Sequence, residues 1–170
     1  SGVVSALSAS LSNPELIPQD GMVAVGGLVY GDTIAEIFTG LVPVTVDNLT
    51  NIIIPALEGL LTDRLVPTDG VDLAGALLGG VALLSDQQAK DQHILLIGSG
   101  EARDGIAIVE ACKEVMNAGV MASALLYRED PTHQTALQGC VDATGGYYEE
   151  VLEDLESACA RALKYMLVVE

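Results

Sequence analysis

Residues 92–105, which read QHILLIGSGEARDG, constrain the fold more than any other part of the chain. Their apolar run at 94–97 is too short for a buried helix, and polar residues and glycines flank it. Such a run predicts a central strand of a parallel sheet, buried on both faces. Gly98 and Gly100 allow a sharp turn at the carboxyl end of this strand, where open α/β sheets place their ligand or metal chemistry.

Strand and helix patterns alternate along the rest of the chain. Strands are predicted at 22–30, 34–38, 92–98, 120–127 and 147–148. Helices are predicted at 3–11, 48–62, 71–84, 108–116, 132–143 and 152–166, with a kink at Pro55 in the second of them. The alternation predicts a single domain, residues 1–170, with a doubly wound α/β fold in which helices cover both faces of a mostly parallel sheet.

The charge of the chain limits its partners. It carries 24 acidic and 7 basic residues, a formal net charge of −17, and the basic residues form no patch. Nucleic acids and anionic membranes require clustered Lys and Arg, so we expect neither as a partner. No apolar run approaches the ~20 residues that span a bilayer, so we expect no membrane insertion. The acidity is compatible with Ca²⁺ sites, a saline exterior or simply a solvated surface.

Patterns for catalysis and nucleotide binding are incomplete. A Gly-Ser-Gly sequence follows the strand at 92–98, but Arg103 stands where a dinucleotide loop has its third glycine. Ser99 does not lie in the Gly-x-Ser-x-Gly turn of hydrolases. His93 and His133 have no Ser or Cys partner at a recognisable spacing. We therefore expect a protein that is not an enzyme.

Several segments resemble the von Willebrand factor A family. Its carboxyl half is matched by HILLIGSGEARDG, VMASALLY, ATGGYYEEV and LEDLESACARAL. Its second strand and its glycine-loop helix are matched by DGMVAVGGLVYG and GVDLAGALLGGVALL. The match covers most of the chain. The resemblance implies a Rossmann-like domain that binds protein ligands through a metal ion at the carboxyl ends of its strands.

The metal ligands that this resemblance implies are missing. The family holds its ion with an Asp-x-Ser-x-Ser loop, a Thr and an Asp in the central loop, because Mg²⁺ requires hard oxygen ligands. Here Ser99 stands at the central-loop Asp position and Val71 at the Thr position, while Ser1 and Val3 stand at the two hydroxyl positions. We therefore expect a degenerate site with no metal and no other cofactor.

The first strand of the family, in the middle of its sheet, would precede Ser1 and is absent from this sequence. Its absence would leave two inner sheet edges unpaired. The run at 166–170 is apolar and β-branched, as a central strand requires. We expect it to fill this slot in its own chain or in a neighbour, through Leu167, Val168, Val169 and Glu170. The alternative is that the last helix continues through Val169.

Three cysteines bear on the compartment. In the implied fold, Cys140 and Cys159 lie on consecutive helices that should pack side by side, and a disulfide between them would stabilise the fold by about 3 kcal/mol. The alternative is two buried thiols. Cys112 lies on the apolar face of its helix and is expected to be an inert core residue. A disulfide fits a secreted, extracellular or cell-surface protein whose signal has been removed.

Two functions remain after these considerations. The first is a non-enzymatic interaction or structural protein of adhesion or filament type, which binds proteins and forms a homo-oligomer or polymer by exchanging its carboxyl-terminal strand. The alternative is a metal-dependent adhesion domain that holds Mg²⁺ or Ca²⁺ in a modified site made of Glu101, Asp104 or Asp69.

Overall fold

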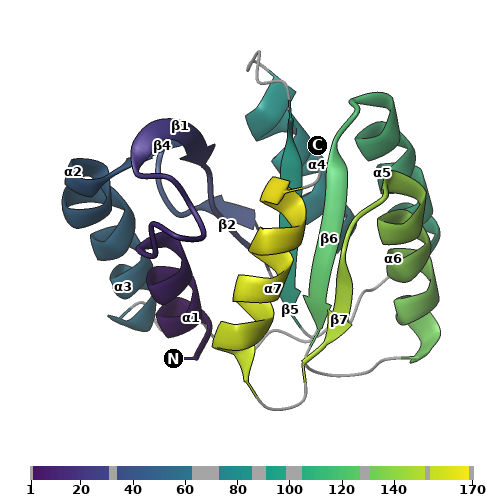
Figure 1. Cartoon of the computed structure of the whole chain (residues 1–170). Coiled ribbons are helices and arrows are strands. Elements are labelled where there is room, and N and C mark those ends of the chain that lie inside the picture. The colour runs from purple at the N-terminus through teal and green to yellow at the C-terminus, as the bar shows by residue number, and fades with distance from the viewer. Residues whose placement is uncertain are drawn as a thin grey trace. The chain divides into compact units, whose positions relative to one another are not determined.

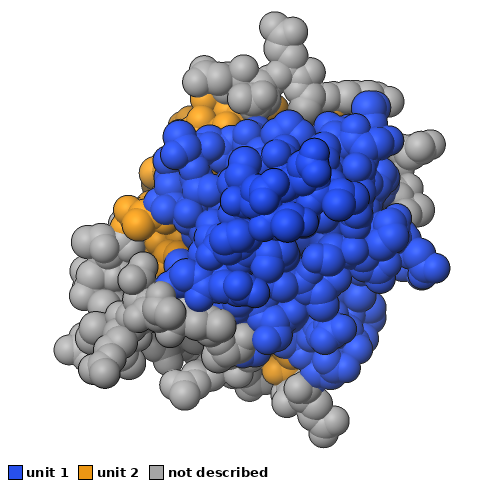
Figure 2. Space-filling view, turned by 90° about the vertical axis from the view of Figure 1, so that its left-hand side faces the viewer, with its two compact units in different colours: residues 1–27, 36–67, 153–170 blue, residues 28–35, 68–152 orange. Residues whose placement is uncertain are grey.

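The computed structural model describes residues 2–30, 34–62, 73–85, 91–98, 105–126, 131–151 and 154–168. The chain divides into two compact units, which Figure 2 shows in different colours. Unit 1 comprises residues 1–27, 36–67 and 153–170, and unit 2 comprises residues 28–35 and 68–152. Each unit is therefore assembled from segments that are distant in the sequence.

Unit 2 is built around a parallel sheet of three strands (Figure 1). The strands lie in the order β5 (His93–Gly98), β6 (Met121–Leu126) and β7 (Tyr148–Glu150). The strand predicted at 92–98 is thus confirmed as a parallel strand. Its predicted central place, buried on both faces, is not, because β5 is an outer strand of the described sheet and four of its six residues are only half-buried. With the helices that follow its first two strands, this sheet has the Rossmann-like α/β organisation expected from the alternating pattern.

Three helices cover this sheet within unit 2. They are α4 (Leu73–Ser85), α5 (Gly105–Asn117) and α6 (Pro131–Thr144). Their apolar faces share one core with alternate residues of β5 and β6, namely Leu73, Leu77, Leu96, Ile108, Ala111, Cys112, Val115, Ala122, Ala124, Leu126, Leu137, Cys140 and Val141. Helix α4 approaches β5 so closely that a Cβ at Gly80 would lie 2.9 Å from the Ile94 side chain.

Strand β6 is buried on both of its faces. Ala122 and Ala124 point toward the helical core, whereas Ser123 and Leu125 point to the opposite face and are also buried. A strand buried on both faces reads as a continuous apolar run, and the sequence of β6 is MASALL. The hydroxyl group of Ser123 is satisfied, because it accepts a hydrogen bond from the Tyr147 backbone N–H at 2.9 Å.

A long hairpin connects the two units along the chain. Its strands are β1 (Asp20–Val25), β2 (Leu28–Tyr30), β3 (Ile34–Glu36) and β4 (Val42–Thr45). β1 pairs with β4, and β2 pairs with β3. The predicted strand at 22–30 is interrupted at Gly27, where a Cβ would lie 2.9 Å from Ile37 Cδ1. Gly27 thus packs closely against the Ile37 side chain, and its carbonyl accepts a hydrogen bond from the Ile37 N–H at 2.9 Å.

Unit 1 packs its helices around α1 (Gly2–Leu11), which lies against α3 (Ile54–Thr62) and α7 (Leu155–Val168). A short α2 (Val46–Asn48) and a π-helical turn η1 (Leu49–Ile53) precede α3. Pro55, the second residue of α3, has no N–H to donate to a carbonyl four residues earlier, and the π-helical turn ends just before α3. The kink at Pro55 stays a prediction.

The carboxyl-terminal strand prediction is wrong for the residues that the structure describes. Leu167 and Val168 belong to helix α7, while Val169 and Glu170 lie outside the described residues. The physical reason is that Cys159, Ala162 and Met166 form one buried helical stripe at intervals of three and four residues, and this stripe carries the helix past Met166.

Candidate functional site

The predicted site is at the carboxyl end of β5, and the structure describes only part of it. Gly98 is described, whereas Ser99 and Val71, together with Ser1, lie outside the described residues. The acidic alternatives Asp69, Glu101 and Asp104 also lie outside them. Val3 is described in α1, where its half-buried side chain offers no oxygen ligand. The degenerate-site prediction therefore stays a prediction.

The described part of the sheet edge is lined by three strand ends. The register places Gly98 beside Leu126, and Leu126 beside Glu150. Tyr30 Oη donates a hydrogen bond to the Ile97 carbonyl at 3.3 Å. A Cβ at Gly98 would overlap Tyr30 Oη, so a larger residue here would require the tyrosine side chain to move. At the end of β5, this edge of the sheet therefore carries an aromatic side chain packed over a glycine.

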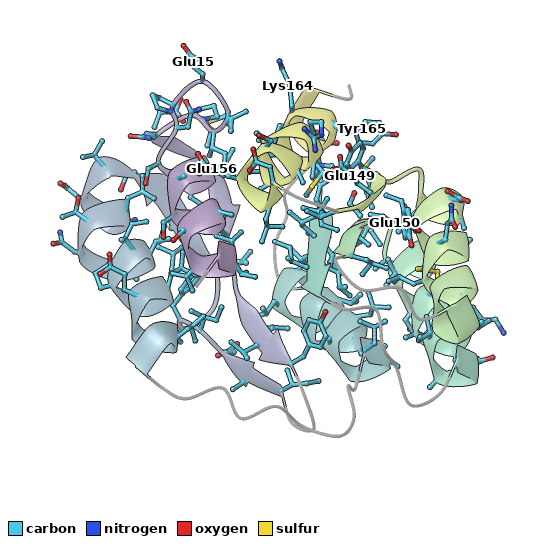
Figure 3. All side chains as sticks on the ribbon, turned by 90° about the horizontal axis from the view of Figure 1, so that it is seen from below. Glu15, Glu149, Glu150, Glu156, Lys164 and Tyr165 are labelled. Atoms are coloured by element: carbon cyan, nitrogen blue, oxygen red, sulfur yellow. A yellow bond between two sulfur atoms is a disulfide. The ribbon has the colours of Figure 1, made fainter. Side chains whose placement is uncertain are left out.

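Acidic side chains occupy the other end of the same edge. Glu149 and Glu150 lie on β7 (Figure 3), and Tyr147 Oη donates a hydrogen bond to Glu149 Oε1. Successive residues of a strand point to opposite faces, so these two carboxylates do not converge on one ion. No cluster of three His, Cys, Asp or Glu side chains able to hold a metal occurs among the described residues.

Sequence reasoning found the position of this edge but missed Tyr30 and Glu149. Tyr30 lies 67 residues from its partner Ile97 in the sequence, and no local pattern links the two. Glu149 could have been found from its spacing to Tyr147. The two residues stand two positions apart, which places them on the same face of an extended segment.

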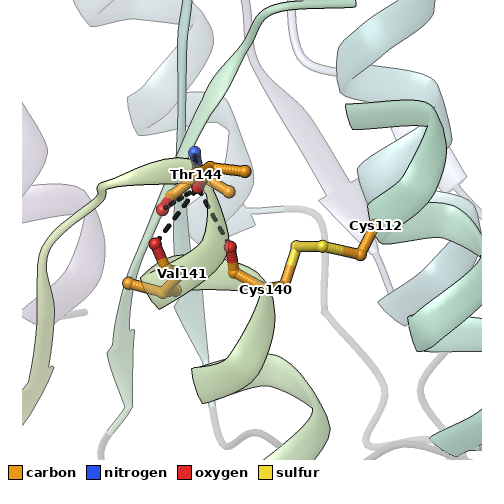
Figure 4. The surroundings of a disulfide bond; sticks show 5 residues. Cys112, Cys140, Val141 and Thr144 are labelled. Carbon is orange, nitrogen blue, oxygen red and sulfur yellow. Dashed lines mark hydrogen bonds between the residues drawn. A yellow bond between two sulfur atoms is a disulfide. The ribbon is translucent and has the colours of Figure 1, made fainter. Parts of the chain in front are cut away.

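The turn between α6 and β7 is the most tightly fitted corner of unit 2. Thr144 Oγ1 accepts a hydrogen bond from Ala122 N at 3.0 Å and lies 3.0 Å from the Cys140 carbonyl, to which it donates (Figure 4). At Gly146 an added Cβ would lie 1.8 Å from the Ala122 carbonyl oxygen. This corner fixes β7, and with it Glu149, against β6.

The predicted disulfide between Cys140 and Cys159 is wrong, because Cys140 is bonded to Cys112 (Figure 4). Helices α5 and α6 are neighbours in unit 2, and the two Cα atoms lie 5.6 Å apart, within the range of a disulfide. Cys112 is therefore not an inert core residue. Cys159 is buried in α7 of unit 1 and takes no part in a disulfide.

Comparison with solved structures identifies the architecture. An aerotolerance-related membrane protein from Bacteroides fragilis aligns with 96% of this chain and 87% of its own, at 18% identity and a TM-score of 0.66. The TFIIH p34 N-terminal domain aligns with 96% of this chain and 83% of its own, at 16% identity and a TM-score of 0.62.

The fold is von Willebrand factor A-like. Human Sec24c, a COPII-coat protein, shares it over 96% of this chain but only 30% of its own, at 14% identity and a TM-score of 0.66. No protein-family model and no curated protein matches the sequence. At these identities the likeness shows the fold alone, and it agrees with the Rossmann-like sheet of unit 2.

The von Willebrand factor A-like fold of this chain contains no membrane span in its described part. None of the helices in the described ranges is both long and apolar enough to cross a bilayer. The longest of them, α6 and α7, have 14 residues each, which is short of the ~20 residues that a bilayer requires.

Proposed function

We propose that this protein is a non-enzymatic protein-interaction domain that acts outside the reducing cytoplasm, as an adhesion-type module. The observation that carries the proposal is the von Willebrand factor A-like fold across 96% of the chain. One protein with a similar fold is named as a coat protein, which is a structural role. A fold is a weaker guide to function than a site, so the proposal needs a direct test.

The disulfide supports the proposed compartment. Disulfides persist in oxidising surroundings and are rare where thioredoxin and glutathione keep thiols reduced. Cys112 and Cys140 are both buried, and the helices that they join are neighbours in the core of unit 2. A bond in such a position contributes to folding, which fits a secreted or surface-exposed domain.

The proposal includes no cofactor and no strand exchange. The helical conformation of Leu167 and Val168 removes the basis for a homo-oligomer or filament built on that segment. Protein binding then depends on the surface of the folded chain. A metal-dependent adhesion domain with a modified site is the competing function, and the same experiment separates the two.

The test is a binding measurement on the whole chain. The chain is immobilised, extracellular proteins of its source are passed over it, and any retained protein is purified and titrated by calorimetry with and without EDTA. We expect saturable binding with the same affinity in both buffers. Loss of binding in EDTA, restored by Mg²⁺ or Ca²⁺, would establish the metal-dependent function instead. Absence of any saturable partner would contradict both.

A further inference from the structure

The parallel sheet of unit 2 has two outer strands of different character. β7 is three residues long, and two of its residues are glutamates. β5 is six residues long, and its sequence HILLIG contains no Asp, Glu, Lys, Arg or Pro. Outer strands that face solvent are commonly short, charged or interrupted by proline, because these features prevent pairing with another chain. β7 has such protection, whereas β5 lacks it.

The sequence of β5 is that of an inner strand. Continuous apolar runs are typical of parallel strands that have both faces covered. In the described sheet, however, β5 pairs with β6 alone, and four of its six residues are only half-buried. This disagreement between sequence and position indicates that β5 lacks one neighbouring strand.

The bonding between β5 and β6 determines which backbone groups of β5 point away from β6. The Met121 N–H donates to the Gln92 carbonyl at 3.0 Å, and the register pairs His93 with Met121. Because alternate residues of a parallel strand bond to the same neighbour, the even-numbered residues of β5 bond to β6. The N–H and carbonyl groups of His93, Leu95 and Ile97 point to the opposite side. We call these groups the β5 edge.

Helix α4 supports both β5 and β2. Its consecutive residues Gly79 and Gly80 approach one strand each. A Cβ at Gly79 would lie 3.0 Å from Leu28 Cδ1 of β2. A Cβ at Gly80 would lie 2.9 Å from Ile94 Cδ1 of β5. The two strands therefore lie on the same helix, although they belong to different sheets of the described structure.

Tyr30, the last residue of β2, reaches from β2 to the β5 edge. Its Oη donates a hydrogen bond to the Ile97 carbonyl at 3.3 Å. Strands that pair directly lie only about 4.8 Å apart, and a tyrosine side chain directed from one backbone to the other needs more room than that. A side chain thus joins β2 to β5 where the backbone of one more strand could lie between them.

The surroundings of this place define what can occupy it. β2, β5 and α4 contain no Asp, Glu, Lys or Arg, so a charged side chain would find no partner there. A second copy is a poor occupant, because its outer strand would arrive with a whole sheet while β2 lies beside the β5 edge. Two copies with a net charge of −17 each also repel one another.

We infer that the β5 edge binds one extended segment of a different polypeptide, made of uncharged, β-branched residues. The segment adds to the sheet between β5 and β2, pairs its backbone with Leu95 and covers α4 with one of its faces. The donor is another protein, so no exchange between copies is involved. This inference rests on the proposed protein-binding function and names the surface and the partner chemistry for it.

The test begins with a synthetic peptide whose core has six residues, the length of β5. The core consists of Val, Ile and Thr, uncharged Gly and Ser flank it, and both termini are blocked. Its binding to the full chain is followed by the fluorescence anisotropy of an attached dye. We expect saturable binding. An analogue with every core amide N-methylated should bind at least tenfold more weakly, because it donates no backbone hydrogen bond.

Hydrogen exchange of single backbone amides, measured by NMR on the full chain, locates the bound peptide. The Leu95 N–H belongs to the β5 edge. The Glu150 N–H is the matched control on β7, because Val151 N–H donates to the Leu126 carbonyl and alternate residues of β7 therefore face β6. We expect saturating peptide to slow exchange at Leu95 at least tenfold and to leave exchange at Glu150 unchanged.

A pair of proline variants provides the same comparison by binding. Leu95→Pro removes an N–H from the β5 edge, and Glu150→Pro removes an N–H from the outer side of β7. We expect Leu95→Pro to weaken peptide binding at least tenfold and Glu150→Pro to leave it unchanged. Circular dichroism shows whether each variant is folded. If Leu95→Pro does not fold, the N-methylated peptide and the exchange rates decide the question.

Several outcomes would overturn the inference. They are no saturable binding of the peptide, equal binding of its N-methylated analogue, or slowed exchange at Glu150 in place of Leu95. Slow exchange at Leu95 without peptide would show that the edge is already covered, by a second copy if light scattering finds a dimer and by the chain itself if it finds a monomer. If a protein retained in the calorimetry experiment binds without slowing exchange at Leu95, the β5 edge is not its binding surface, while the proposed function stands.

Discussion

Gly146 shows how a single residue can decide a packing arrangement. A methyl group there would lie 1.8 Å from the Ala122 carbonyl oxygen, a backbone atom that cannot rotate away. We predict that Gly146→Ala destabilises the protein by about 2 kcal/mol or more, in the range of overpacked sites. The matched control is Gly139→Ala in α6, where nothing lies within 4 Å and where alanine should stabilise the helix by about 0.5–1 kcal/mol. Urea denaturation measures both changes, and equal effects would contradict the argument.

Thr144 contributes a hydroxyl group that joins α6 to β6. We predict that Thr144→Val costs about 1–3 kcal/mol, because the Ala122 N–H and the Cys140 carbonyl lose their partner in a partly buried place. Thr144→Ser keeps the hydroxyl group and should recover most of that stability. A loss in Thr144→Ser as large as that in Thr144→Val would show that the hydroxyl group alone does not account for the contribution of Thr144.

His93 gives the protein a specific pH response. Burial lowers the pKa of His93 below its ordinary value of 6.5, and Asp91 opposes this only in part. Nδ1 of His93 is buried without a hydrogen-bond partner in the described part of the chain. The unfolded chain therefore binds a proton more readily than the folded one, so stability is present above pH 6.5 and falls as the pH drops through the lowered pKa. We predict that His93→Gln flattens the dependence of Tm on pH in this range. An unchanged slope would show that other groups cause it.

At the scale of elements, the disulfide ties α5 to α6. It closes a loop with a sequence separation of 28, and the loss of chain entropy in the unfolded state corresponds to about 3.5 kcal/mol. We predict that the double variant Cys112→Ala, Cys140→Ala loses about 2–4 kcal/mol, whereas Cys159→Ala keeps the bond. Thiol titration of the denatured, unreduced protein should find one thiol, and peptide mapping should link Cys112 to Cys140. Three thiols would contradict the pairing.

The elements also show how far sequence patterns reach. Apolar periodicity located α5 and β6, because Ile108, Val115 and Leu125 are buried as that periodicity requires. Strand β4 was missed since Pro43 reads as a strand breaker, although Val42 and Val44 alternate inward. Strand β4 lies at the edge of the two-stranded sheet that it forms with β1, and proline is tolerated in edge strands.

The candidate site was predictable only in position. The glycine-rich end of β5 follows from local sequence, but the packing of Tyr30 over Gly98 depends on a contact between segments far apart in the chain. The disulfide partner of Cys140 was predicted wrongly, for a related reason. Cys112 and Cys159 both lie on buried helix faces, and only the packing of α5 against α6 selects between them.

At the scale of the whole molecule, the net charge of −17 implies strong self-repulsion in the folded state. Raising NaCl from about 0.05 M to about 0.5 M shortens the screening length from roughly 14 Å to roughly 4 Å. We predict that the weaker repulsion raises the free energy of unfolding, and that each kcal/mol gained in this way raises Tm by roughly 2–4 °C. MgCl₂ and CaCl₂ at matched ionic strength should act no more strongly than NaCl. A larger shift with either would indicate a bound divalent cation and favour the modified metal site.

The pairing of β1 with β4 limits how copies of this chain could associate. An open-ended chain of subunits requires two free edges that fit each other, so that each copy adds to the last. On β4, Pro43 has no N–H and its carbonyl accepts a hydrogen bond from Asn48 Nδ2, and on β1 the Met22 N–H donates to Asp20 Oδ1. Side chains of the same chain therefore occupy backbone groups on both strands of this pair. Such local capping disfavours growth of an assembly by addition of one copy's strand to the next.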